Sequence, residues 1–196
     1  MYSSLVGILG WSPVFAQLSN VTTPTLNLTA ISAVNGQSVL ECWQIPEFAA
    51  SASAGTVGAL NLFLGDGSNA TYTVIPPRFN GGVHNAPAVQ YARAIQNAMA
   101  STLTRKPRLV SFTSGLIHIT LPNTTICPTT EAWIQGGKYG LIIAADTANV
   151  SKYGHITTYP GDAVTIAMQI PFKPGYIPEH TVLYPGPCHY NEIIGI

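Results

Sequence analysis

The chain has 196 residues, a length typical of one domain with a sizeable hydrophobic core. Its charge is low and balanced, with 8 basic and 8 acidic residues, which argues against nucleic-acid binding and against electrostatic attachment to a membrane. Glycine and proline are plentiful, at 18 and 15 residues, as is typical of many short strands joined by tight turns.

The first 16 residues fit the pattern of a secretory signal peptide. An apolar run at residues 5–10 is too short to span a bilayer, and Val14-Phe15-Ala16 places small residues at the cleavage positions. We therefore predict a secreted, extracellular protein with no membrane span, whose mature chain begins near Gln17. Because no Lys or Arg precedes the apolar run, a buried first strand is the alternative interpretation.

The next segment, residues 17–36, is rich in Thr, Asn and Ser and is predicted to be an extended lead-in to a single domain at residues 37–196. Five Asn-x-Ser/Thr sequences without an intervening proline fit the N-glycosylation pattern. Together with the signal-like start, they favour a secreted eukaryotic glycoprotein. The predicted acceptors are Asn20, Asn27, Asn69, Asn123 and Asn149.

Strand-like segments then follow one another along the chain, separated by turn signals such as Gly65-Asp66-Gly67 and Pro160-Gly161-Asp162. Short strands at this spacing predict an all-β sandwich, barrel or jelly roll. The predicted strands are residues 39–44, 57–64, 71–75, 109–121, 139–145, 155–159, 163–170 and 180–184.

One segment, residues 91–108, departs from the strand pattern. It is rich in alanine, has apolar residues near helical spacing, and contains Arg93, Arg105, Lys106 and Arg108 but no acidic residue. Two interpretations stay open. The segment is either an inserted helical or irregular excursion between two strands, or the translation of a retained short intron.

The chain contains three cysteines. Cys42 opens the predicted domain and Cys188 closes it, so we predict a disulfide that joins the two ends. Cys127 is left over, either buried and inert or available for exchange with another thiol.

The stretch FNGGVHNAPAVQ, residues 79–90, contains the first cluster of candidate site residues. If residues 91–108 are set aside, six residues separate Gln90 from Gly115. This arrangement resembles the first motif of the cupin family, a glycine followed by His-x-His, a glutamate and a later glycine. His84 stands at the first histidine, Ala86 at the second and Gln90 at the glutamate.

The second cupin motif has a histidine in a strand and an asparagine four positions later. His155 resembles this histidine, with Tyr159 in the place of the asparagine. His180, which follows Pro174-Gly175, is a second candidate and a candidate acid–base catalytic residue. The resemblance covers about residues 57–185 and extends to small secreted fungal cupin-like proteins. It implies a cupin-like jelly-roll barrel or β-sandwich.

The resemblance also implies candidate ligands for a divalent first-row transition metal such as Mn, Fe, Ni or Cu, namely His84, Gln90 and His155. Cupin metals are generally held by three histidines and one carboxylate. Here Ala86 offers no donor and Gln90 is neutral, so we expect a degenerate site with low affinity. Alternatively, His84 packs at the mouth of the barrel and hydrogen-bonds a loop carbonyl.

Two classes of function follow from these observations. The first is a binding or surface protein for a small molecule or carbohydrate, which has lost the metal site. The second is a metal-dependent cupin enzyme, an oxygenase, decarboxylase or isomerase that acts on a small organic substrate. Ala86 and Gln90 favour the first class. Cupins commonly pair as homodimers through exposed sheet edges, which makes a homodimer a further expectation.

Overall fold

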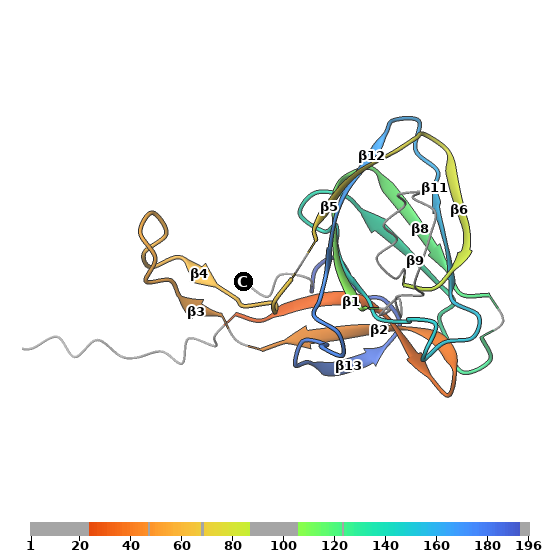
Figure 1. Cartoon of the computed structure of the whole chain (residues 1–196), viewed down its shortest axis with the longest axis horizontal. Helices are drawn as coiled ribbons and strands as arrows, with labels where there is room; N and C mark the ends of the chain where they lie inside the picture. Colours follow the sequence, from red (N-terminus) through yellow and green to blue (C-terminus); the bar gives the residue numbers. More distant parts are fainter. Residues whose placement is uncertain (1–23, 47, 68, 87–105, 123, 193–196) are drawn as a thin grey trace, which may run out of the picture.

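The fold is a two-sheet β-sandwich. The computed structural model describes residues 24–46, 48–67, 69–86, 106–122 and 124–192, and these residues form thirteen strands and no helix. Figure 1 shows the two larger sheets facing each other, with a small hairpin projecting to one side. The prediction of an all-β fold is confirmed. Within the described residues the sheets do not close into a barrel.

The larger sheet has seven strands in the order β13-β2-β1-β10-β7-β12-β5. Strands β1 and β10 run parallel, and the other neighbours are antiparallel. The bounds are β1 (Leu26–Val34), β2 (Gln37–Ile45), β5 (Thr71–Ile75), β7 (Arg108–Ser114), β10 (Leu141–Ala144), β12 (Thr165–Pro171) and β13 (Thr181–Pro185).

The smaller sheet has four antiparallel strands in the order β6-β11-β8-β9. They are β6 (Phe79–His84), β8 (Leu116–Thr120), β9 (Glu131–Gln135) and β11 (His155–Tyr159). The projecting hairpin consists of β3 (Ala49–Ala50) and β4 (Leu60–Asn61).

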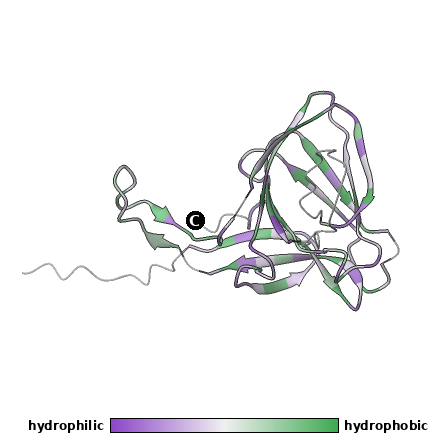
Figure 2. Cartoon of the chain, in the orientation of Figure 1, coloured by the Kyte–Doolittle hydropathy of each residue, from purple (hydrophilic) through white to green (hydrophobic). Residues whose placement is uncertain are grey.

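The main core lies between the two sheets, and Figure 2 shows the hydrophobic residues distributed along the strands. Alternate residues of each strand face inward, so Ile117 and Ile119 of β8 are buried while the residue between them is half-buried. The seven-stranded sheet also buries its outer face around Trp43 and Phe172. Its interior strand β1 is therefore buried on both faces, as expected for a strand covered on both sides.

Most predicted strands are present, and two, β5 and β11, match residue for residue. The predicted strand 109–121 is two strands, because the chain turns at Gly115, whose φ is +94°. Of the predicted strand 57–64, only residues 60 and 61 belong to a strand. Strands β3, β6 and β9 were not predicted.

The N-terminal boundary differs from the expectation. Residues 26–34, which the sequence places in a lead-in before the domain, form β1 between β2 and β10. The β1–β2 connection is a tight turn at Asn35-Gly36, where both residues have positive φ, as type I′ hairpins require. The domain therefore includes these residues. Residues 1–16, where we predict a signal peptide, lie outside the described residues.

The atypical segment predicted at residues 91–108 overlaps a strand at its C-terminal end. Residues 87–105 lie outside the described residues, but Arg108 is the first residue of β7 and is buried. Arg108 therefore belongs to the sheet.

In the part of the chain that the structure describes, no helix is long and apolar enough to cross a bilayer.

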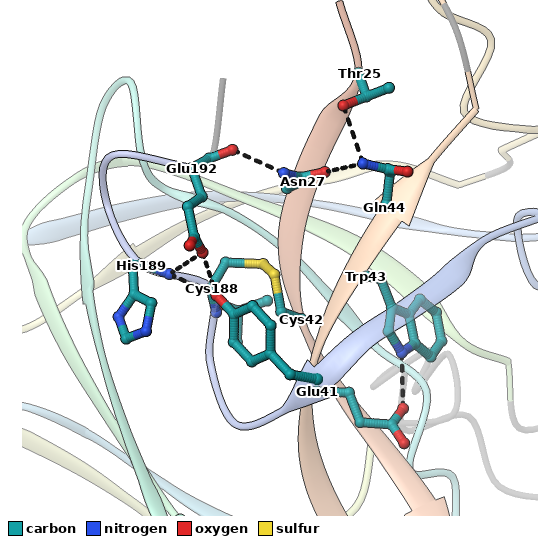
Figure 3. Close-up of a disulfide and its surroundings, with 11 residues drawn as sticks. Thr25, Asn27, Glu41, Cys42, Trp43, Gln44, Cys188, His189 and Glu192 are labelled. Carbon is teal, nitrogen blue, oxygen red and sulfur yellow. Dashed lines mark hydrogen bonds between the residues drawn. A yellow bond between two sulfur atoms is a disulfide. The ribbon is translucent and has the colours of Figure 1, made fainter. Parts of the chain in front are cut away.

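The predicted disulfide between Cys42 and Cys188 is confirmed (Figure 3). It links β2 to the segment after β13, across 146 positions of sequence. Cys127 is a free, half-buried thiol whose Sγ lies 2.8 Å from the carbonyl oxygen of Thr129.

Candidate functional site

His84 and His155, the two histidines of the predicted metal site, lie next to each other. They are paired residues on the neighbouring antiparallel strands β6 and β11, and their ring centroids are 4.5 Å apart. Both side chains face the space between the sheets. The structure thus brings together two residues that are far apart in the sequence.

A buried carboxylate, Asp146, anchors His155 of this histidine pair. Its Oδ2 atom lies 2.7 Å from Nδ1 of His155 and accepts a hydrogen bond of 2.7 Å from the hydroxyl of Ser38. Its Oδ1 atom accepts the backbone N–H of Ala86 at 3.1 Å. The side chain is fully buried, so these bonds compensate for the loss of hydration.

The hydrogen bonds also indicate the tautomer of each ring. Nδ1 of His84 lies 2.9 Å from the carbonyl oxygen of Gly82, and Nδ1 of His155 faces a carboxylate. Both partners are acceptors, so Nδ1 carries the proton in each ring. In the neutral form, Nε2 of each histidine then has the free lone pair. His84 thus bonds a backbone carbonyl, as the alternative interpretation expected, but this carbonyl belongs to β6 itself and not to a loop.

The pKa of His84 is lowered from its usual value of 6.5. The main cause is burial, and the neighbouring His155 and Arg108 lower the pKa further. The Gly82 carbonyl and Asp146 each raise the pKa of His84, but the net shift is downward. Burial, assisted by the neighbouring His155 and Arg108, therefore favours the neutral form of His84 at neutral pH.

The two histidines line a cavity of about 90 Å³ between the sheets. The cavity has apolar and polar parts. The apolar lining residues are Ile31, Val110, Phe112, Ile119, Ile142 and Ala144, and the polar ones are His84, Arg108, His155, Thr157, Tyr159 and Gln169.

Arg108 and Tyr159 line the cavity, although the sequence analysis assigned neither of them a role at the site. The guanidinium Nη1 of Arg108 donates to Oε1 of Gln169, and burial lowers the pKa of Arg108 from 12.5 to about 10, so it stays charged at neutral pH. Burial raises the pKa of Tyr159 to about 12, so its hydroxyl stays protonated. The alternation of His155, Thr157 and Tyr159 along one face of β11 was the signal that could have placed Tyr159 here.

No family model matches this chain, and no curated protein matches it. The donor set can still be tested against the metal site that the cupin resemblance implies. His84 and His155 supply two imidazoles, Ala86 is buried and has no donor side chain, and both oxygens of Asp146 are already hydrogen-bonded. No group of three or more His, Cys, Asp or Glu among the described residues could hold a metal ion. Gln90 lies outside those residues. The residues present therefore do not fit a complete cupin centre.

His180 does not lie at this site. Its ring stacks on Trp43 with centroids 3.5 Å apart, and its Nδ1 atom lies 2.7 Å from the carbonyl oxygen of Pro178. Trp43 is buried, so these contacts hold His180 against the opposite face of the seven-stranded sheet. An acid–base role for His180 in the cavity has no geometric support.

The predicted glycosylation sites differ in exposure. Asn69 and Asn149 are exposed. Asn27 is only 8% exposed, and its Nδ2 atom donates to the backbone carbonyl of Glu192 at 3.0 Å (Figure 3). A glycan on this nitrogen is incompatible with that contact. Asn20 and Asn123 lie outside the described residues.

Proposed function

We propose that this chain is a secreted, cupin-like glycoprotein that binds a small organic molecule in the cavity between its sheets. The cavity itself is the observation that carries the proposal. It combines apolar walls with a few polar groups, as small-molecule sites usually do. Asp146 holds His155 and the Gly82 carbonyl holds His84, so hydrogen bonds within the protein orient both rings.

The sandwich fold and the adjacent His84 and His155 support the cupin-like part of the proposal. The site is a degenerate form of a cupin metal site, because only two imidazoles remain and the second histidine position is Ala86. Two neutral ligands without a carboxylate hold a divalent ion weakly. A small-molecule binding protein is therefore favoured over a metal enzyme.

Binding in the cavity can be tested by NMR of isoleucine methyl groups in the full-length secreted protein. A fragment library that contains neutral and charged compounds should include ligands that shift the methyl signals of Ile31, Ile119 and Ile142, which line the cavity. Ile45, which is buried in the other core, is the matched control and should not shift with them. If no fragment shifts the cavity methyl signals, the proposal fails.

A metal-dependent cupin enzyme is the second candidate, favoured by one observation. Asp146 orients His155 through Nδ1, as carboxylates often do for metal-binding histidines. Elemental analysis of the secreted protein separates the candidates. A degenerate site should give well under one metal ion per chain. Stoichiometric metal that is lost in both His84→Ala and His155→Ala would favour the enzyme and contradict the first proposal.

Secretion is supported by the disulfide and by the exposed sequons. When the gene is expressed in a eukaryotic host with its own N-terminus, we expect the protein in the medium, with glycans on Asn69 and Asn149 and none on Asn27. Peptide mass spectrometry before and after deglycosylation measures the occupancy of each site. Retention of an unglycosylated protein inside the cell would contradict the proposal.

A further inference from the structure

We propose that the outer face of the four-stranded sheet, around Trp133 and His118, is a binding site for a neutral oligosaccharide. The sugar is one whose ring hydroxyls are equatorial, such as β-linked glucose, and its flat C–H face lies on the indole of Trp133. This site is separate from the cavity between the sheets, so the inference goes beyond the proposed function. An exposed aromatic ring, its rigid support, the polar groups around it and the low charge of the face each support it.

Trp133 is a large aromatic side chain that the fold leaves exposed. It lies on β9, an edge strand of its sheet, between Ala132 and Ile134, which are buried in the core. Because side chains alternate along a strand, the indole lies on the outer face, where it is 46% exposed. Trp43, by contrast, is buried, which is the more common place for tryptophan.

Contacts within the protein hold this indole in one orientation. Its ring stacks on the imidazole of His118, the residue opposite it on β8, with centroids 3.9 Å apart and 8° between the planes. Nε2 of His118 in turn lies 2.7 Å from Oε2 of Glu131. The backbone oxygen of Trp133 accepts a hydrogen bond of 3.0 Å from the hydroxyl of Tyr190. A ring that is already oriented loses little conformational entropy when a ligand stacks on it.

The indole is surrounded by polar groups that are available to a ligand. Among the described residues, no ring other than that of His118 and no cation packs on it, and its Nε1–H donates no hydrogen bond. Glu131 and Gln135 lie two residues before and after Trp133, on the same face of β9, and both are exposed. The Oε1 atom of each side chain accepts no hydrogen bond within the described part of the chain. One donor and two acceptors therefore surround the ring.

A pyranose with equatorial hydroxyls matches this arrangement. Its hydroxyls lie around the rim of the ring, so each face presents axial C–H groups and is apolar enough to pack on an aromatic ring. Each rim hydroxyl both donates and accepts hydrogen bonds. Such a sugar can therefore stack on the indole while its hydroxyls accept from Nε1 of Trp133 and donate to Glu131 and Gln135.

The charge of the face favours a neutral sugar. Of the outward-facing residues of β8, β9 and β11, all of them described, Glu131 is the sole carboxylate and none is lysine or arginine. These strands therefore offer no cation to pair with a sulfate or uronate group. A protein interface usually has a contiguous apolar centre. Here Thr120 and Thr158 lie beside Glu131 and His118 on the neighbouring strands, which breaks such a centre.

NMR of the indole N–H groups in the full-length protein tests this site. Cellotetraose and chitotetraose, two β-linked sugars with equatorial ring substituents, should cause a saturable shift of the Trp133 signal, which Trp133→Phe assigns by removing it. The Nε1–H of Trp43, which is bonded to Glu41 at 2.7 Å, is the internal control and should not shift. If neither sugar gives a saturable shift of the Trp133 signal, the inference is overturned.

Sorbitol is the matched control ligand, because it has the hydroxyls of a sugar but no ring face. At an equal concentration of hydroxyl groups it should leave the Trp133 signal unchanged. A shift as large as that caused by cellotetraose would overturn the inference, because stacking would then contribute nothing.

Substitution of Trp133 measures the contribution of the stacking. Trp133→Ala should weaken the binding of cellotetraose in calorimetry by about 10-fold, and Trp133→Phe, which keeps a smaller ring, should lose less. Tyr72→Ala is the matched control and should bind as the wild type does, because Tyr72 is an exposed aromatic residue on β5, an edge strand of the other sheet. A folded Trp133→Ala protein with unchanged affinity would overturn the inference. If this variant does not fold, Trp133→Phe and the comparison with sorbitol decide the matter.

Two other outcomes have their own readouts. Cellotetraose should leave the methyl signals of Ile31 and Ile142 in the cavity unchanged, and a shift of these signals without one at Trp133 would place the sugar in the cavity and overturn the inference. A second copy of the chain is the alternative occupant of this face. Sedimentation of the sugar-free protein as a dimer, together with a Trp133 signal that shifts with protein concentration, would also overturn the inference.

Discussion

Asp146 is the residue that ties the site to the rest of the molecule. It is fully buried two residues after β10 and accepts hydrogen bonds from Ser38 in β2, from His155 in β11 and from the backbone of Ala86 after β6. Ser38 is also bonded to Ser151 at 2.7 Å, which extends the network. One carboxylate thus joins both sheets at one end of the sandwich.

We predict that Asp146→Ala lowers the free energy of unfolding by about 3 kcal/mol, because several buried donors lose their acceptor. Asp162→Ala is the control, since Asp162 is 80% exposed in its ion pair with Arg78 and should cost under about 1 kcal/mol. Chemical denaturation of both variants measures the difference. Equal losses in the two variants would contradict a structural role for the network.

His84 should make stability depend on pH. Its pKa in the folded protein is lowered, chiefly by burial, so below its usual value of 6.5 the unfolded chain binds more protons than the folded one. The stability that neutral His84 contributes is therefore present above about pH 6.5. It is lost as the pH falls from there through the lowered pKa.

Denaturation curves at several pH values test this expectation. His84→Gln, which cannot be protonated, should lose less stability than the wild type between pH 6.5 and 5. Between pH 7 and 8 the two proteins should show the same dependence. A steeper loss of stability in His84→Gln would show that the sign is wrong.

Among the structural elements, the junction of β7 and β8 places the two sheets relative to each other. β7 belongs to the seven-stranded sheet and β8 to the four-stranded sheet, and only Gly115 separates them. Gly115 has a φ of +94°, and a Cβ atom there would lie 2.1 Å from the hydroxyl oxygen of Thr165. The chain therefore changes sheets at a position that only glycine fills without strain.

Gly115→Ala should lower the free energy of unfolding by about 2–4 kcal/mol, from backbone strain together with the clash against the buried Thr165. Gly137→Ala is a matched control, because Gly137 has a φ of +89° but no atom within 4 Å of the added Cβ. It should cost only about 1 kcal/mol. Thermal and urea unfolding measure both. A similar cost for both variants would exclude the clash as a cause.

At the scale of the whole molecule, the Cys42–Cys188 disulfide holds the C-terminal segment against β2. Around it, the side chain of Asn27 donates a hydrogen bond to the backbone carbonyl of Glu192 (Figure 3). The carboxylate of Glu192 accepts a hydrogen bond from the hydroxyl of Tyr184. The C-terminal segment therefore depends on contacts with the two N-terminal strands. The bridge spans 146 positions, so it strongly restricts the unfolded chain.

Replacing both cysteines with alanine should lower the free energy of unfolding by up to about 5 kcal/mol, the loop-entropy value for a closure of this length. Cys127→Ala is the control and should leave the bridge intact, since Cys127 is a free thiol. Thiol labelling of the denatured wild type should detect one thiol per chain, and none in Cys127→Ala. A greater loss of stability in Cys127→Ala than in the double variant would contradict the assignment.

Several features could be read from the amino acids alone because their signals are local. The strand-like segments between turn signals predicted β5 and β11 residue for residue, and the positions of Cys42 and Cys188 predicted the bridge. A local signal for β1 was also present, in the Asn35-Gly36 turn, but the polar composition around it obscured the strand. His84 and His155 were identified from motif spacing, and the structure places them side by side.

The cavity could not be predicted from the sequence, because it is formed by contacts between residues that are far apart in the chain. Its lining residues come from seven strands, and the order of those strands in the sheets does not follow their order in the chain. Arg108 was assigned to the atypical segment on composition, whereas pairing with β10 and β12 places it at the cavity. In the sequence, Asp146 is only an acidic residue that follows an apolar strand. Its role could not be predicted, because its partners Ser38 and Ala86 lie 108 and 60 positions away. Side-chain alternation specifies which face of a strand is buried, but long-range strand pairing specifies what that face meets.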